Sequence, residues 1–158
     1  MARRDRASGD RKAAARAGGE ARGYFDKWFP SADAFKRMAD GAVSSGDRNE
    51  AAFVLHQATE RLYHCVLLVF TLYSPKSHKL NFLRSHAEEG APELIAAWPR
   101  ADKFSRRCFD LLRQAYVNAR YSPHYEISDE ELRWLGDRVT ELQAMVKVVC
   151  ERRLLAND

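Results

Sequence analysis

The segment that decides the fold reads RNEAAFVLHQATERLYHCVLLVFTLY and runs from Arg48 to Tyr73. Its apolar residues recur at intervals of three and four, which is the period of one face of an α-helix. They are Leu55, Ala58, Leu62, Cys65, Val69 and Tyr73. The opposite side is polar at first but carries Leu67 and Leu68 further along. We therefore expect this helix to be covered on several sides, by neighbouring helices or by a second copy of the chain.

The same helical period continues on both sides of this segment, and no stretch shows the sustained alternation of a β-strand. Long helices joined by short links predict an all-α fold, an up-and-down antiparallel bundle of four to five main helices. No run approaches the ~18 consecutive apolar residues that a bilayer span requires, so we expect no membrane contact. The expected helices cover about residues 23–43, 48–73, 78–89, 102–121 and 128–154.

Local signals predict where several helices begin and end. Pro30 is expected to kink or break the first helix, because proline lacks an amide proton and clashes with the preceding turn. Asp47 followed by Glu50, and Ser128 followed by Glu131, have the spacing of a capping box, in which the first side chain bonds the amide three residues on. We therefore expect helices to start directly after Asp47 and Ser128.

Charge is distributed unevenly along the 158 residues, whose formal net charge is +4. Seven of the 26 basic residues and three of the 22 acidic residues lie in residues 1–22, which leaves 19 of each sign in residues 23–158. We expect residues 1–22 to form a mobile basic tail and residues 23–158 to form one helical domain. The tail is interpreted either as a solvated linker or as a nucleic-acid-binding arm. Because the domain is neutral overall, a phosphate site has to come from a local cluster of charges.

Other features of the sequence exclude several classes of protein. The arginines near the N-terminus are followed by no apolar run, so we expect no secretory signal and a cytoplasmic location. The three cysteines contain no close pair, which argues against both a disulfide framework and a zinc knuckle. His56, Glu60 and His64 share a helix face and are an alternative zinc site, but the polar side of a buried helix explains them more simply. We expect no metal and no cofactor.

The segment YVNARYSPHYEI, Tyr116 to Ile127, is the main candidate for chemistry. Arg120 can bind a phosphate through two hydrogen bonds, His124 offers the residue type most used as a general acid or base, and the tyrosines offer stacking faces and hydroxyls. A structural interpretation is equally open. In it, Arg120 complements the negative end of its helix and the tyrosines seal one end of the bundle.

Several stretches of sequence, taken in order, resemble the HEPN domain family (higher eukaryotes and prokaryotes nucleotide-binding). They are YFDKWF at 24–29, NEAAFVLHQATE at 49–60 with YHCVLLVFT at 63–71, KSHKL at 76–80, and YVNARYSPHYEI at 116–127. The resemblance implies a helical bundle that forms a homodimer and binds a nucleotide or RNA in a groove between helices. It also implies a nucleotidyltransferase domain acting in cis or in trans. No Gly-Ser followed by paired carboxylates occurs here, so we expect that partner to be a separate unit.

For this chain the resemblance implies that Arg120 faces a phosphate with other polar residues around it. Many family members are metal-independent ribonucleases in which an arginine is followed, after four to six residues, by a histidine. Only three residues separate Arg120 from His124 here. One alternative is therefore a toxin-like endoribonuclease with Arg120 and His124 as its catalytic pair. Another is a purely structural dimerisation domain. The implied ligand-binding residues are Gln57, Glu60, Asn118, Arg120, Tyr121 and Tyr125.

Overall fold

The computed structural model of the chain describes residues 2–157, and in that range it contains helices and no strand. The elements are α1 (Ala2–Ser44), α2 (Arg48–Thr71), α3 (Leu80–Gly90), the short 3-10 helix η1 (Pro92–Ala97), α4 (Lys103–Tyr121) and α5 (Asp129–Ala156). The all-α prediction is confirmed. None of the helices in the described range is both long enough and apolar enough to cross a membrane.

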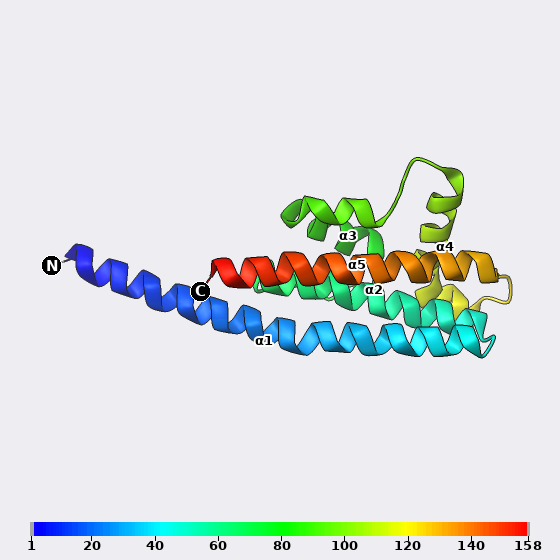
Figure 1. The fold of residues 1–158 in the computed structure, drawn as a ribbon, viewed down its shortest axis with the longest axis horizontal. Coiled ribbons are helices and arrows are strands. Elements are labelled where there is room, and N and C mark those ends of the chain that lie inside the picture. Colours follow the sequence, from blue (N-terminus) through cyan, green and yellow to red (C-terminus); the bar gives the residue numbers. More distant parts are fainter. Residues whose placement is uncertain (1, 158) are drawn as a thin grey trace.

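The three longest helices run side by side along the long axis of the molecule, with α3 and α4 on one side of them (Figure 1). α2 packs against α1, α3, α4 and α5, so it is the central helix. α1 runs opposite to both α2 and α5, and these two run in the same direction, so the antiparallel pairs among the long helices are α1 with α2 and α1 with α5. Arg48 joins the starts of α2 and α5, because its Nε and Nη2 donate to Asp129 at 2.8 and 3.0 Å.

The second apolar side of α2 is covered within a single chain. Leu67 and Leu68, which suggested a second copy of the chain, are 7% and 8% exposed. Neighbouring helices of the same chain therefore account for these two residues. The homodimer remains a prediction that rests on the family resemblance.

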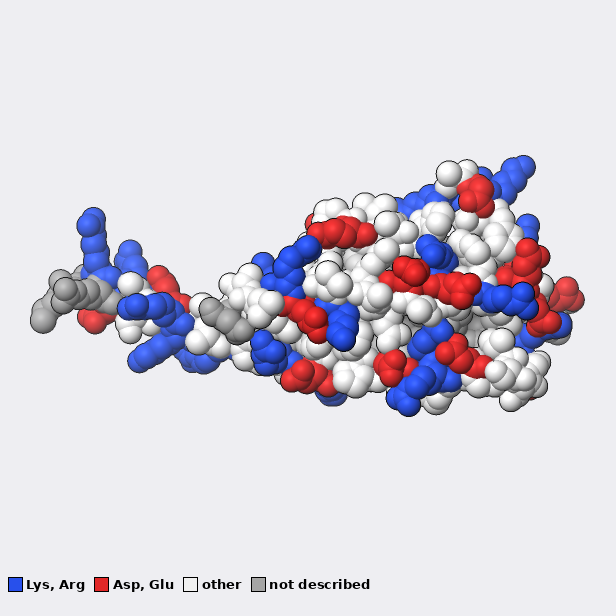
Figure 2. Space-filling view, in the orientation of Figure 1, with Lys and Arg blue, Asp and Glu red and all other residues white. Residues whose placement is uncertain are grey.

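α1 is longer than the sequence predicted. The predicted break at Pro30 does not occur, because α1 continues through this residue and aromatic side chains on both sides of it pack against the core. Residues 2–22, where we expected a mobile tail, continue the same helix. Alanine and arginine, which dominate this stretch, are strong helix formers, so the packed part of α1 can extend through it. Figure 2 shows basic side chains crowded on this projecting part and mixed charges over the rest of that face.

One of the two predicted capping boxes is present. At the start of α5, Ser128 Oγ accepts from the amide of Glu131 at 3.1 Å, and Glu131 Oε1 accepts from the amide of Ser128 at 2.9 Å. The prediction was wrong at Asp47, whose side chain makes no capping hydrogen bond. Its ψ of 76° departs from the extended conformation that usually aims a capping side chain at the first turn.

Candidate functional site

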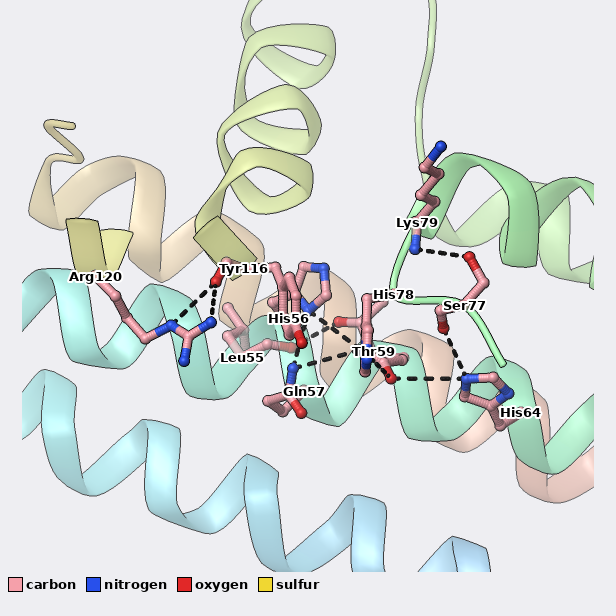
Figure 3. Close-up of polar contacts among 11 residues, drawn as sticks. Leu55, His56, Gln57, Thr59, His64, Ser77, His78, Lys79, Tyr116 and Arg120 are labelled. Carbon is pink, nitrogen blue, oxygen red and sulfur yellow. Dashed lines mark hydrogen bonds and ion pairs between the residues drawn. The ribbon is translucent and has the colours of Figure 1, made fainter. Parts of the chain in front are cut away.

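The segment between α2 and α3, residues 72–79, is held against α2 by His64. The chain leaves α2 at Leu72, whose φ of 61° is left-handed and turns the backbone away from the helix axis. Nδ1 of His64 contacts the hydroxyl of Ser74. Nε2 of His64 lies 3.2 Å from the carbonyl oxygen of Ser77 (Figure 3). Because a carbonyl oxygen only accepts, Nε2 carries a proton, and in the neutral ring Nδ1 accepts from Ser74.

Glu60 is a buried carboxylate surrounded by three imidazoles. Its side chain is 9% exposed, and Oε1 accepts a hydrogen bond from Nδ1 of His78 at 2.8 Å. Nδ1 of His56 and Nε2 of His64 lie 3.6 and 3.7 Å from its oxygens. Burial alone would raise the pKa of Glu60, but together the neighbouring histidines outweigh burial and the pKa falls below its ordinary value. Glu60 is therefore an anion at neutral pH.

His56 is the fully buried member of this cluster. Burial lowers its pKa to about 4 despite the opposing attraction of Glu60, so the ring is neutral at neutral pH. The amide nitrogen of Gln57 lies 3.3 Å from Nδ1 and donates to it, which leaves the proton on Nε2. Within residues 2–157 this Nε2 has no hydrogen-bond partner. The ring itself lies 5.4 Å from the ring of Tyr116.

The side chain of His78 connects α2 with α4. Its ring stacks on that of Tyr116, with the centroids 4.3 Å apart, while Nδ1 bonds Glu60. Tyr116 in turn lies 5.2 Å from the guanidinium of Arg120, which donates from Nε and Nη2 to the Tyr116 carbonyl at 3.1 and 2.8 Å (Figure 3). The guanidinium also lies 4.4 Å from the ring centroid of Phe53. A continuous series of contacts thus joins the buried carboxylate to the exposed guanidinium.

Two grooves meet at His78. The main groove, with a volume of ≈ 800 Å³, lies between residues 76–82 and α4. The second groove, of ≈ 500 Å³, lies between α1, α2 and residues 74–78. Lys76, Ser77 and His78 line both of them. The cationic and amide side chains of the main groove are Lys76, Lys79, Asn81, Arg113, Gln114 and Asn118.

The predicted ligand-binding residues lie in several parts of this region. Asn118 lines the main groove, whereas Gln57 and Glu60 line the second. Arg120 and Tyr121 lie about one turn beyond Tyr116 on α4, and Tyr121 is 71% exposed. Arg120 and Glu60 are therefore linked through the His78 and Tyr116 rings rather than by direct contact.

Tyr125 and His124 lie outside both grooves. Tyr125 is buried and its hydroxyl donates to the carbonyl of Leu111 at 2.8 Å, as the structural interpretation of the tyrosines predicts. His124 is exposed, and its side chain makes no contact with Arg120 in the described part of the chain. The structure does not bring Arg120, His124 and Tyr125 into one pocket. The physical reason is that α4 ends at Tyr121, and the loop after it has Tyr125 buried and His124 in solvent.

The prediction from sequence did not include His78, Tyr116, Lys76 or Lys79 among the site residues. Helical periodicity could not find His78 and the lysines, because they lie in the non-helical segment between α2 and α3. The available signal was the family resemblance, since the KSHKL stretch and the YVNARYSPHYEI stretch contain all four residues.

No cluster of three or more histidine, cysteine, aspartate or glutamate side chains between residues 2 and 157 is arranged to hold a metal ion. The zinc alternative for His56, Glu60 and His64 also meets a chemical obstacle. Both ring nitrogens of His64 are occupied, one by Ser74 and the other by the Ser77 carbonyl. A zinc ligand needs a ring nitrogen with a free lone pair.

The fold and the site together define an all-α domain whose central helix carries a buried polar cluster beside two surface grooves. The model of the HEPN domain family matches residues 25–149, which include every residue of both grooves. The chain belongs to this family. No curated protein matches the chain.

Proposed function

We propose that this HEPN domain is a nucleotide- or RNA-binding module and that its ligand occupies the main groove. The observation that carries the proposal is that Lys76 and Lys79 line the same groove as the stacked rings of His78 and Tyr116. Lysine ammonium groups neutralise phosphates, and aromatic faces accept stacked bases. The groove volume of ≈ 800 Å³ lies within the range of small-ligand sites, about 300–1,000 Å³.

The cations of the main groove are available to a ligand. Lys76 and Lys79 are exposed, and neither has a carboxylate within ion-pair distance in residues 2–157. Arg113 is paired with Asp110 at 2.6 Å, so it contributes less. The first turn of α3 adds backbone donors: Lys79 makes no side-chain cap, and Asn81, in that turn, lines the groove. Amide groups at a helix start carry partial positive charge and favour phosphate oxygens.

A salt-dependent binding assay tests this proposal. Fluorescence anisotropy would measure the affinity of a fluorescein-labelled single-stranded RNA, and calorimetry that of AMP. The double variant Lys76→Ala/Lys79→Ala is expected to weaken both by tenfold or more, and to reduce the slope of log affinity against log salt by about 1.4 for RNA. The matched control is Lys103→Ala/Lys147→Ala, which removes two exposed lysines that line neither groove. Equal affinities for the two double variants would overturn the proposal.

Arg120 is proposed to extend the ligand path beyond Tyr116. Its Nε and Nη2 are engaged with the Tyr116 carbonyl, whereas Nη1 has no hydrogen-bond partner in the described residues. Loss of affinity in Arg120→Ala without a change in unfolding free energy would support this extension. Unchanged affinity would confine the ligand to the main groove.

The finer expectations from the family resemblance belong to the same proposal. A homodimer predicts a sedimentation coefficient that rises with protein concentration, and a nucleotidyltransferase partner predicts co-elution with such a domain. The ribonuclease alternative gains no support from the contacts of Arg120 and His124. It would be favoured over binding alone if RNA were cleaved in the presence of a chelator and His124→Ala abolished the cleavage.

A further inference from the structure

The two ring nitrogens of His78 face different environments. Nδ1 donates to the carboxylate of Glu60, which is buried, while the side chain of His78 as a whole is 54% exposed. Because a carboxylate only accepts, the proton of the neutral ring stays on Nδ1. Nε2 is then the free nitrogen, and within residues 2–157 it has no hydrogen-bond partner. His78 lines the main groove, so this nitrogen belongs to the part of the ring that a ligand can reach.

The protonation state of His78 decides which ligand groups this nitrogen can bind. In the neutral ring, Nε2 presents a lone pair, which repels the oxygens of a phosphate. In the imidazolium, Nε2 becomes a donor with positive charge, and Nδ1 still donates to the anionic Glu60. A fully ionised phosphate in the main groove is therefore compatible with the imidazolium, whereas the neutral ring accepts only a phosphate oxygen that carries a proton.

Two cationic side chains line the same groove as His78. Lys76 and Lys79 flank His78 in the same segment and line the same groove. Together with an imidazolium they supply three positive charges. A phosphate monoester carries about −1.5 to −2 charges at neutral pH, whereas a phosphodiester carries one. Three cations therefore match a terminal phosphate better than an internal one.

We propose that His78 binds the terminal phosphate of a nucleotide or of an RNA end as an imidazolium, so that occupation of the main groove is coupled to protonation of this ring. This inference rests on the proposed function. It adds that the ligand carries a terminal phosphate and that the His78 ring is protonated when it binds. Glu60 is a positioning residue in this site: it orients the ring and stabilises the imidazolium, without touching the ligand.

His56 and Glu60 do not account for such proton uptake. His56 is neutral because burial has lowered its pKa to about 4, and Glu60 is already ionised. His64 is buried, and its two nitrogens contact the Ser74 hydroxyl and the Ser77 carbonyl. The charged and titratable groups around His78 and the two grooves that it lines are Glu60, His56, Arg61 and His64 from α2, Lys76 and Lys79 from its own segment, and Arg113, Tyr116 and Arg120 from α4.

The experiment compares one RNA oligonucleotide with a 5′-phosphate and with a 5′-hydroxyl, at pH 6, 7 and 8. The full chain is expected to prefer the 5′-phosphorylated RNA, by about tenfold at pH 6 and less at pH 8. AMP against adenosine gives the same comparison for a free nucleotide and distinguishes the two sources of the phosphate. Calorimetry at pH 7 in buffers of different ionisation enthalpy measures the protons taken up. Since a phosphate monoester itself titrates near pH 6, each ligand is compared between variants.

Three variants make the outcome decisive. His78→Gln keeps a neutral polar side chain and is expected to lose both the preference for the terminal phosphate and the proton uptake. Glu60→Gln removes the anion behind the ring, so the preference should persist only at lower pH. The control is His86→Gln, which replaces an exposed histidine outside the main groove and should behave as the unmodified chain.

The results separate this inference from the proposed function. Binding of RNA or AMP with no preference for the terminal phosphate, or with a preference that His78→Gln retains, would overturn the role of His78 and leave the binding module intact. Absence of binding by either ligand would overturn both. Circular dichroism of His78→Gln verifies its fold, and if it does not fold, the pH shift in Glu60→Gln decides the question.

Discussion

The imidazole of His78 lies nearly parallel to the phenol ring of Tyr116, with the centroids 4.3 Å apart and the planes inclined by 12°. The two residues are far apart in the sequence and lie on different elements. His78 precedes α3, and Tyr116 lies near the end of α4. Their stacking therefore fixes the segment between α2 and α3 against α4 and forms one wall of the main groove.

The first prediction concerns this stacked pair. Tyr116→Ala removes the ring that holds His78, and aromatic pairs contribute about 0.5–1.5 kcal/mol. We expect the affinity for single-stranded RNA to fall by about two- to tenfold, measured by fluorescence anisotropy. Tyr116→Phe keeps the ring and is the matched control, with affinity close to that of the unmodified chain. If the alanine variant bound RNA equally well, the stack would have no part in binding.

The second prediction compares the two helix starts that look alike in sequence. Ser128→Ala removes an observed capping hydrogen bond and is expected to lower the free energy of unfolding by about 1 kcal/mol. Asp47→Ala removes a side chain that makes no capping bond, so a change within about 0.5 kcal/mol is expected. Urea denaturation at neutral pH measures both. Equal losses for the two variants would mean that Asp47 caps α2 in solution.

The third prediction concerns a buried hydrogen bond that joins α2 to the residue following η1. Nε1 of Trp98 donates to the hydroxyl of Tyr63 at 2.7 Å, and both side chains are fully buried. Tyr63→Phe leaves the indole donor without a partner, which is expected to cost about 1–3 kcal/mol. Tyr121→Phe, at a residue 71% exposed, is the control and should leave the unfolding free energy unchanged. A Tyr63→Phe variant as stable as the unmodified chain would show that the donor finds another partner.

The fourth prediction is a loss of stability in mild acid. The pKa of His56 in the folded chain is about 4, below its ordinary value of 6.5. Between these values the unfolded chain binds a proton at this residue and the folded chain does not, so the stability present above pH 6.5 is lost as the pH falls toward 4. We expect His56 to account for about 2 kcal/mol of lost stability between pH 7 and pH 5.

Two variants isolate this effect in urea denaturation at pH 7 and pH 5. His56→Gln has no proton to gain, so its unfolding free energy should depend less on pH than that of the unmodified chain. The control is His86→Gln, at a histidine whose side chain is 46% exposed, and it should keep the full pH dependence. The pKa of Glu60 is lowered, so the loss of its contribution falls below this pH window. An unchanged pH dependence in His56→Gln would contradict the assignment.

The helices could be predicted because their signals are local. The period of apolar residues gave α2, α4 and α5 nearly to their ends, and the Ser128–Glu131 pair placed the start of α5. Of the two outcomes predicted at Pro30, the break does not occur, because tertiary packing compensates for the lost backbone hydrogen bond, and the kink stays a prediction. Residues 2–22 were not predicted to be helical because they lack large apolar residues, and the prediction gave too little weight to their helix propensity.

The site could be predicted only in part because its residues come from three elements. Glu60, Gln57 and Asn118 do line the two grooves, but no sequence period relates them to His78. The position of His78 follows from the left-handed turn at Leu72 and from two hydrogen bonds to α2, which only a three-dimensional structure reveals. The sequence neighbours Arg120 and His124 were paired by analogy with a motif. Their geometry depends on a loop that the motif does not determine.

α2 is at once the centre of the hydrophobic core and the support of His78. A ligand that binds the main groove of the folded chain and does not bind the unfolded chain therefore raises the melting temperature. At a concentration one hundred times its dissociation constant, it stabilises the folded chain by about 2.7 kcal/mol. The melting temperature of the domain thus reports ligand binding directly. Thermal unfolding measured with each nucleotide of a panel in turn, without a label or an activity assay, identifies the nucleotide that the domain binds.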